Sequence, residues 1–221
     1  DEINDFCQHG TYCWFFGDSF QSIMGFNHPV QSVEKTANQI GVHPQDLCIN
    51  WRLTIENAKV GEHIRPHSRL SFACVKHGPK PRLVKSKAQL DKIIEYISNG
   101  NLTDVGILVY YNEQVERIRD YFQLKGIPVQ WKTKEDMEID FKSTSPKIIT
   151  WHSAKGLQFN DVFIPCCGLN EYRQFVPPYY YHEPMYCKSA LYVATTRPLE
   201  NLYLLYTNNL APLLPNPNSP V

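Results

Sequence analysis

Residues 147–164 read KIITWHSAKGLQFNDVFI, and this stretch decides the fold class. It begins with a short strand-like run from Lys147 to Thr150, passes through a polar turn closed by Gly156, and returns to an apolar run at Val162 to Ile164. Two such strands around a polar turn are typical of a parallel α/β sheet, where ligand chemistry gathers at the ends of strands. We therefore expect the turn to be a functional site.

The rest of the chain alternates strand-like and helix-like segments, which predicts a parallel sheet flanked by helices. Apolar residues recur every three or four positions from Lys87 to Ser98, the pattern of an amphipathic helix. A strand at Val105 to Tyr110 and a helix from Glu113 to Lys125, ended by Gly126, follow. A helix is also expected at 54–64, and strands at 12–16, 47–49, 129–131 and 201–206, with short strands across 70–84.

The composition is that of an ordinary globular domain, with 221 residues, 43% of them hydrophobic and 20% charged. Lys plus Arg and Asp plus Glu are equal at 22 each, so a nucleic-acid partner would need a local basic groove. The seven cysteines form no C-x-x-C pair, which indicates reduced thiols and a cytoplasmic protein. A zinc site from Cys166, Cys167, His182 and Cys187 is the alternative, although their spacing fits no common site. No apolar run is long enough for a bilayer, and we expect no membrane partner.

A second informative segment, residues 191–197, reads LYVATTR and ends in an arginine followed by Pro198. An always-charged guanidinium in such a place suits a phosphate that gains charge during transfer. Together with TWHSAKGLQF at 150–159, this segment resembles motifs VI and V of the UvrD/Rep-like superfamily 1 DNA helicases. The resemblance implies a RecA-like fold of the P-loop NTPase type.

Three further segments resemble earlier motifs of the same helicases, in the family's order. Asp1-Glu2 is similar to motif II, GDSFQSIMGF at 17–26 to motif III, and NWRLT at 50–54 to motif IV. None of these short matches is specific by itself, because two acids or one arginine are common on any surface. Their order and spacing carry the resemblance.

The resemblance implies a set of residues that bind ATP and Mg²⁺. Asp1 would hold the Mg²⁺ that accompanies ATP, and Glu2 would polarise the attacking water. Three side chains would contact the γ-phosphate: Gln21, Arg52 and Arg197. Gly156 would allow close backbone approach to the ligand, and Gln158 would contact the ribose.

The resemblance also implies contacts with single-stranded DNA. Phe26 would stack on a base, while Thr150, His152 and Lys155 would contact the DNA backbone. The aromatic run YYYH at 179–182 could stack on bases as well, although a packed loop is the more common use of such a cluster.

The phosphate loop Gly-x-x-x-x-Gly-Lys-Ser/Thr occurs nowhere in the 221 residues. In the family it precedes motif II, so we expect the missing N-terminal RecA-like portion to be a partner and this fragment alone to be inactive in ATP hydrolysis. Residues 1–45 would be the trailing part of a first RecA-like domain and 46–210 a second one. Residues 211–221 would be an extended or disordered tail.

The predicted function is therefore that of a C-terminal fragment of an ATP-dependent DNA helicase or translocase. The alternative is a helicase-like module that has lost hydrolysis and binds DNA or a protein. Three departures favour it: Gln158 stands where the family has Glu, Pro198 where it has Ala, and Lys188 is the only basic residue of the stretch upstream of Arg197. A nuclease would need a carboxylate cluster that the later chain does not contain.

Overall fold

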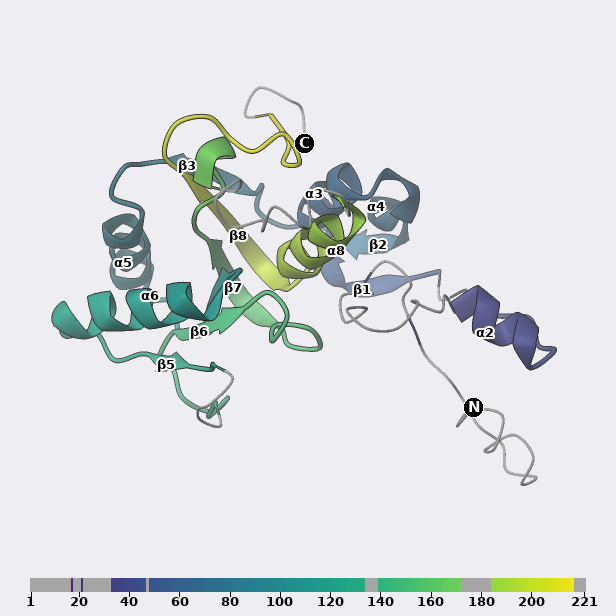
Figure 1. Cartoon of the computed structure of the whole chain (residues 1–221), viewed down its shortest axis with the longest axis horizontal. Helices are drawn as coiled ribbons and strands as arrows, with labels where there is room; N and C mark the ends of the chain where they lie inside the picture. The colour runs from purple at the N-terminus through teal and green to yellow at the C-terminus, as the bar shows by residue number, and fades with distance from the viewer. Residues whose placement is uncertain are drawn as a thin grey trace.

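A computed structural model of the chain describes residues 17, 21, 33–46, 48–133, 139–171 and 184–216. Its centre is a six-stranded, wholly parallel sheet in the order β3-β8-β7-β4-β6-β5. Figure 1 labels β3, β8, β7, β6 and β5 of this sheet. The strands are β3 (Arg82–Lys85), β4 (Val105–Val109), β5 (Gln130–Trp131), β6 (Lys147–Thr150), β7 (Phe159–Ile164) and β8 (Pro198–Tyr206). The predicted parallel α/β fold is confirmed.

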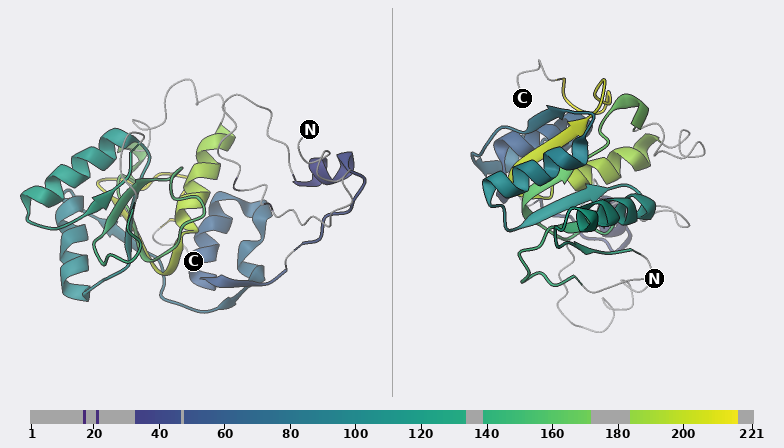
Figure 2. Two further views of the ribbon diagram at one scale, coloured as in Figure 1. Left: turned by 90° about the horizontal axis from the view of Figure 1, so that it is seen from below. Right: turned by 90° about the vertical axis from the view of Figure 1, so that its left-hand side faces the viewer.

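Helices cover both faces of this sheet (Figure 2). α5 (Gln89–Gly100) and α6 (Asn112–Leu124) pack on one face, and α3 (Ile55–Ile64) and α8 (Pro184–Thr195) on the other. Because successive side chains of a strand point to opposite faces, Ile148 joins the core under α5 and α6, whereas Ile149 joins the core under α3 and α8. The strands are buried on both sides, which explains their nearly continuous apolar sequences.

A smaller two-stranded parallel sheet of β1 (Asn50–Thr54) and β2 (Cys74–Lys76) adjoins the start of β8. Thr54 caps α3, since its hydroxyl accepts the Asn57 backbone N–H at 3.2 Å. The Asn57 side chain then donates to the Glu200 carbonyl at 2.8 Å, and Lys76 forms an ion pair with the Glu200 carboxylate. These contacts tie the small sheet to the large one. The remaining elements are α2 (Val33–Gln39), η2 (Pro66–Ser68) and α4 (Leu70–Ala73).

Several predicted elements are confirmed. α5, α6, β4 and β6 lie where the sequence pattern places them, and α6 ends before Gly126, whose φ of 71° is left-handed. The strand expected at 12–16 lies outside the described residues. No helix among the described residues could span a membrane.

Two expectations need correction, and two further features were not foreseen. The strand expected at 47–49 begins instead at Asn50, so Arg52 lies inside β1 rather than after it. Residues 70–73, expected to be strand, form α4. The sequence reading also missed α8, because this helix is apolar on nearly all sides and shows no amphipathic stripe. The start of the expected tail packs on the core, where Ala211 and Leu214 are 1% and 4% exposed.

Candidate functional site at two edges of the sheet

Residues 150–159 connect opposite edges of the parallel sheet. Thr150 ends β6 opposite Val109, at the carboxyl edge, whereas Phe159 begins β7 opposite Pro198, at the amino edge. The pairing of Val105 with Asp161 sets these levels six residues apart along β4, about 20 Å at the usual rise per residue. This short connection therefore places the predicted DNA contacts at one edge and the predicted ribose contact at the other.

At the amino edge, Arg197 lies between the end of α8 and the start of β8 and is 1% exposed. Its Nε donates to the Val193 carbonyl at 2.8 Å and its Nη2 to the Thr196 hydroxyl at 3.0 Å. Nη1 reaches the Leu157 carbonyl at 3.4 Å, so the two sequence segments 150–159 and 191–197 are joined directly. The guanidinium is held in place by carbonyl and hydroxyl dipoles on several sides.

The same guanidinium meets Gln21, another predicted γ-phosphate contact. Nη2 of Arg197 donates to Oε1 of Gln21 at 3.4 Å across 176 residues of sequence. The fold thus brings together two side chains that the sequence reading assigned to one phosphate group.

Arg52, the third predicted phosphate contact, is placed by a local irregularity in β1. The Asn50 side chain accepts the backbone N–H groups of Arg52 and Leu53 at 3.0 and 3.1 Å, and the register with β2 shifts there. Burial raises the pKa of the neighbouring Cys74 thiol to about 11, and the Arg52 charge opposes that rise. Nε of Arg52 is buried with no acceptor in the described chain. No hydrogen bond between described residues joins Arg52 to Arg197 or Gln21.

Gly156 and Gln158 lie on the exposed part of the connection. Gly156 has a φ of 85°, and a Cβ added there would meet nothing within 4 Å. The left-handed backbone conformation therefore favours glycine at this position, and there is no lack of space for a side chain. Gln158 follows Leu157, the residue whose carbonyl Arg197 contacts. Asp1, Glu2 and Phe26 lie outside the described residues, as does the aromatic run at 179–182.

At the carboxyl edge, Thr150 is 7% exposed, and its side chain is hydrogen-bonded within the turn. Its hydroxyl donates to the Ser153 hydroxyl at 3.1 Å and accepts the Ser153 backbone N–H at 3.1 Å. The backbone N–H of Lys155 donates to the His152 carbonyl at 3.2 Å, which closes the turn. The half-buried His152 and the exposed Lys155 remain the outward groups of this turn.

An aromatic layer supports the turn from below. Trp151 donates its indole N–H to the Leu108 carbonyl at 3.2 Å and meets Tyr110 edge to face at 5.2 Å between centroids. Tyr110 also contacts His152 and Tyr111, at 5.5 and 4.7 Å between centroids. Burial lowers the pKa of His152, which favours its neutral form. The sequence reading missed Tyr110 and Tyr111, although two tyrosines directly after a buried strand were a usable signal.

Part of the chain matches a known family model. Residues 130–209 match the family model of the UvrD-like helicase C-terminal domain. The matched span contains the connection at 150–159 and Arg197, so the resemblance stated from these motifs is confirmed. No match was found among curated proteins.

The fold is also similar to a solved structure, the C-terminal domain of a possible DNA helicase from Lactobacillus plantarum WCFS1. The TM-score is 0.56 at 16% identity, and the match covers 74% of this chain and 91% of that one. At this identity the similarity supports the fold alone.

The described residues form no metal cluster, and their two buried arginine groups differ in how far they are already paired. No group of three or more His, Cys, Asp or Glu side chains in the described part of the chain could hold a metal ion, and His182 of the zinc alternative lies outside that part. Nε of Arg52 is buried with no acceptor among the described groups, whereas the Arg197 side chain already donates to Val193, Thr196, Leu157 and Gln21. A guanidinium donor such as the Arg52 Nε would suit a phosphate oxygen, while a backbone cradle for further phosphates is not encoded in these residues.

Proposed function

We propose that the chain is the C-terminal part of a motor that uses ATP to move along single-stranded DNA. The observation that carries the proposal is the contact between Arg197 and Gln21 at the amino edge. Both side chains were assigned to the γ-phosphate from separate motifs, and an interaction across 176 residues is unlike a chance surface contact. The helicase-related family match supports the same reading.

The amino edge would sense the nucleotide. ATP, bound with Mg²⁺, supplies the phosphoryl group to be transferred to water. Arg197 would stabilise the charge that develops on that group, an effect on the order of 10³- to 10⁵-fold in rate where an arginine acts this way. Arg52 would give a second charged donor, Gln21 a neutral one, and Gln158 an amide for the ribose. In the same proposal, Asp1 would hold the Mg²⁺ and Glu2 would polarise the attacking water.

The connection at 150–159 would couple the nucleotide to DNA. Its Leu157 carbonyl contacts Arg197 at the amino edge, and its His152 and Lys155 lie at the carboxyl edge. A change in the hydrogen bonds of Arg197 would therefore act on one end of a short segment whose other end faces the strand. Thr150 would help by fixing the turn through Ser153.

One observation favours the second candidate, a helicase-like module that binds DNA or a protein without hydrolysis. Arg197 is 1% exposed, and its side chain already donates to Val193, Thr196, Leu157 and Gln21. A phosphate would have to replace some of these acceptors before the guanidinium could serve it. In this candidate Arg197 is a structural residue only.

Single-strand-stimulated ATP hydrolysis separates the two candidates. The measurement needs the polypeptide extended at its N-terminus to include a phosphate loop, beside its Arg197→Ala and Arg197→Lys variants. Strong stimulation that collapses in Arg197→Ala supports the motor. If the extended protein binds ATP and single strands but hydrolyses nothing, the motor proposal fails and the binding module stands.

A further inference from the structure

A groove opens at the carboxyl ends of β3 and β8, apart from the connection at 150–159. Its volume is about 520 Å³. Lys85 ends β3 beside Tyr206, the last residue of β8, and the Ser86 N–H donates to the Tyr206 carbonyl at 2.9 Å. His63, in the last turn of α3, forms the opposite wall. The polar lining consists of His63, Lys85, Tyr206, Asn208, Asn209 and Asn216.

The lining has the chemistry of an anion site. Lys85 carries a positive charge and the His63 imidazole can donate a hydrogen bond. None of the described lining residues is acidic. Both side chains are exposed, and neither makes an ion pair or side-chain hydrogen bond within the described parts of the chain. Three asparagine amides add neutral donors, while Ala211 and Leu214 give an apolar floor. In a chain of zero net charge, this is a local basic groove.

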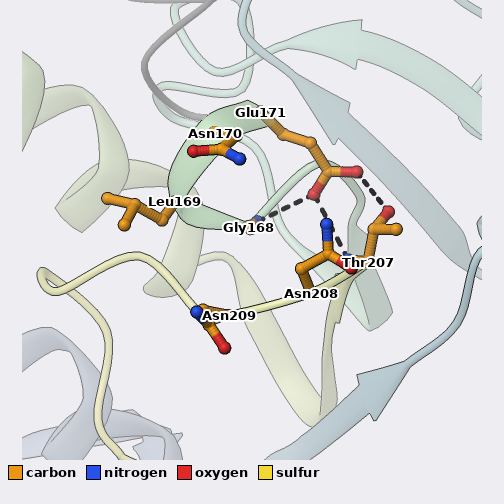
Figure 3. A pocket seen from close by; sticks show the side chains of 7 residues that line it. All are labelled: Gly168, Leu169, Asn170, Glu171, Thr207, Asn208 and Asn209. Carbon is orange, nitrogen blue, oxygen red and sulfur yellow. Dashed lines mark hydrogen bonds between the residues drawn. The ribbon is translucent and has the colours of Figure 1, made fainter.

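Asn208 and Asn209 follow Thr207, which is hydrogen-bonded to Glu171, as Figure 3 shows. Glu171 accepts the Thr207 hydroxyl and backbone N–H at 2.5 and 3.4 Å, the Gly168 N–H at 3.0 Å and the Gln89 amide at 2.8 Å. The Leu169 N–H donates to the Asn209 carbonyl at 2.7 Å. Four donors thus satisfy the nearby carboxylate, so its charge is partly compensated and does not strongly repel an anion. The backbone that carries Asn208 and Asn209 is therefore fixed on both sides of the groove's edge by these bonds.

The groove shares an edge with the predicted DNA contacts. All strands of the large sheet are parallel, so the ends of β3 and β8 lie at the same edge as the end of β6. From β6 to β3 there are four strand spacings, about 19 Å in all. Past His63 the chain exposes two further basic side chains, His67 and Arg69, whereas Arg65 between them is half-buried and donates to the Ser189 hydroxyl.

We propose that this groove binds backbone phosphates of the same single strand that His152 and Lys155 contact. The strand then runs along the carboxyl edge from β6 to β3, with Lys85 and His63 pairing to phosphates. This path rests on the proposed function, because it requires single-stranded nucleic acid as the ligand.

The test is the salt dependence of binding to a fluorescein-labelled oligothymidylate of about 16 nucleotides, followed by anisotropy. Each phosphate contact on a single strand contributes about 0.7 to the slope of log K against log salt. The Lys85→Gln variant should lose about 0.7 from the magnitude of that slope. Lys142→Gln is the matched control, since Lys142 is exposed just before β6 at the opposite edge. Its slope should equal that of the wild type.

The outcomes separate this proposal from the one on which it rests. A smaller slope in Lys85→Gln but not in Lys142→Gln supports the groove, provided that thermal unfolding shows Lys85→Gln to be folded. An unchanged slope with normal wild-type binding overturns the groove and leaves the motor intact. Failure of the wild type to bind any single strand overturns both. If inorganic phosphate binds the wild type but not Lys85→Gln, and the salt slopes of the two proteins are equal, the groove is a site for free phosphate and the strand path is overturned.

Discussion

The two edges of the parallel sheet use their polar residues in different ways. At the amino edge the candidate functional group is itself part of the core, because Arg197 is 1% exposed and bonded to α8 and to the connection at 150–159. At the carboxyl edge the outward groups, His152 and Lys155, sit on a separate buried layer of Trp151 and Tyr110.

This difference has a consequence for mutagenesis. At the amino edge stability and activity should fall together, because one side chain serves both. At the carboxyl edge they should separate, because the ring layer carries the stability and the residues above it carry the binding. Four substitutions, in order of expected effect, test that contrast.

The largest effect is expected for Trp151→Ala in the buried layer. Loss of a ring that is 6% exposed should lower the free energy of unfolding by about 3–5 kcal/mol. Trp51→Ala is the matched control, since Trp51 is 75% exposed and should cost under about 0.5 kcal/mol. Urea unfolding measures both. Equal costs for the two tryptophans would contradict the view that the carboxyl edge rests on a separate structural layer.

Arg197→Ala should lower the free energy of unfolding by roughly 2–3 kcal/mol, since a charged donor to buried carbonyls is removed. The exposed Arg117 on α6 provides the control, and Arg117→Ala should cost less than about 0.5 kcal/mol. Urea unfolding of both variants is the measurement. An Arg197→Ala variant as stable as the wild type would mean that the arginine has no structural role, and the contrast between the edges would disappear.

Gly156→Ala tests the segment that joins the edges. A φ of 85° is costly for alanine, so the free energy of unfolding should fall by about 1–2 kcal/mol although no atom would clash. Gly156→Asn should be milder, because asparagine tolerates the left-handed region better. Thermal unfolding compares the two. If Gly156→Ala and Gly156→Asn lower the stability by the same amount, backbone strain at this position does not determine the loss.

The smallest effect concerns pH. Burial lowers the pKa of His152 below its ordinary 6.5, so the unfolded chain takes up a proton first as pH falls. The contribution of neutral His152 to the free energy of unfolding is therefore fully present above about pH 6.5. It is lost as the pH falls through 6.5 toward the lower pKa of the folded state. His152→Gln should flatten the decline in unfolding free energy between about pH 7 and 5, whereas the exposed His67→Gln should not. An identical pH profile for wild type and His152→Gln would rule out this linkage.

Local sequence patterns predicted most of the large sheet and three of its covering helices, α3, α5 and α6. α5 and α6 each bury one stripe, and β4 and β6 are short apolar runs, so their patterns can be read without tertiary information. α8 was not predicted, because its residues from Ser189 to Thr195 are all buried and such a segment has no polar face to mark its period. The strand predicted at 47–49 lies instead at Asn50–Thr54, where the Asn50 side chain accepts the backbone N–H groups of Arg52 and Leu53.

The candidate site was less predictable than the motifs that pointed to it. The types and order of residues at 150–159 and 191–197 were sufficient for the helicase resemblance. They did not reveal that Thr150 is tied into its turn, or that Tyr110 and Tyr111 lie beside His152. Those facts depend on β4 lying next to β6, which is a pairing between segments distant in sequence.

By itself, therefore, the sequence determined the fold class and the family resemblance, because hydrophobic period and motif chemistry are local properties. Only the tertiary structure decided which groups meet: Arg197 with Gln21 and Leu157 at one edge, and Lys85 with His63 across a groove at the other. These contacts arise from strand order and helix packing, which bring together residues whose separation along the chain carries no signal of their proximity.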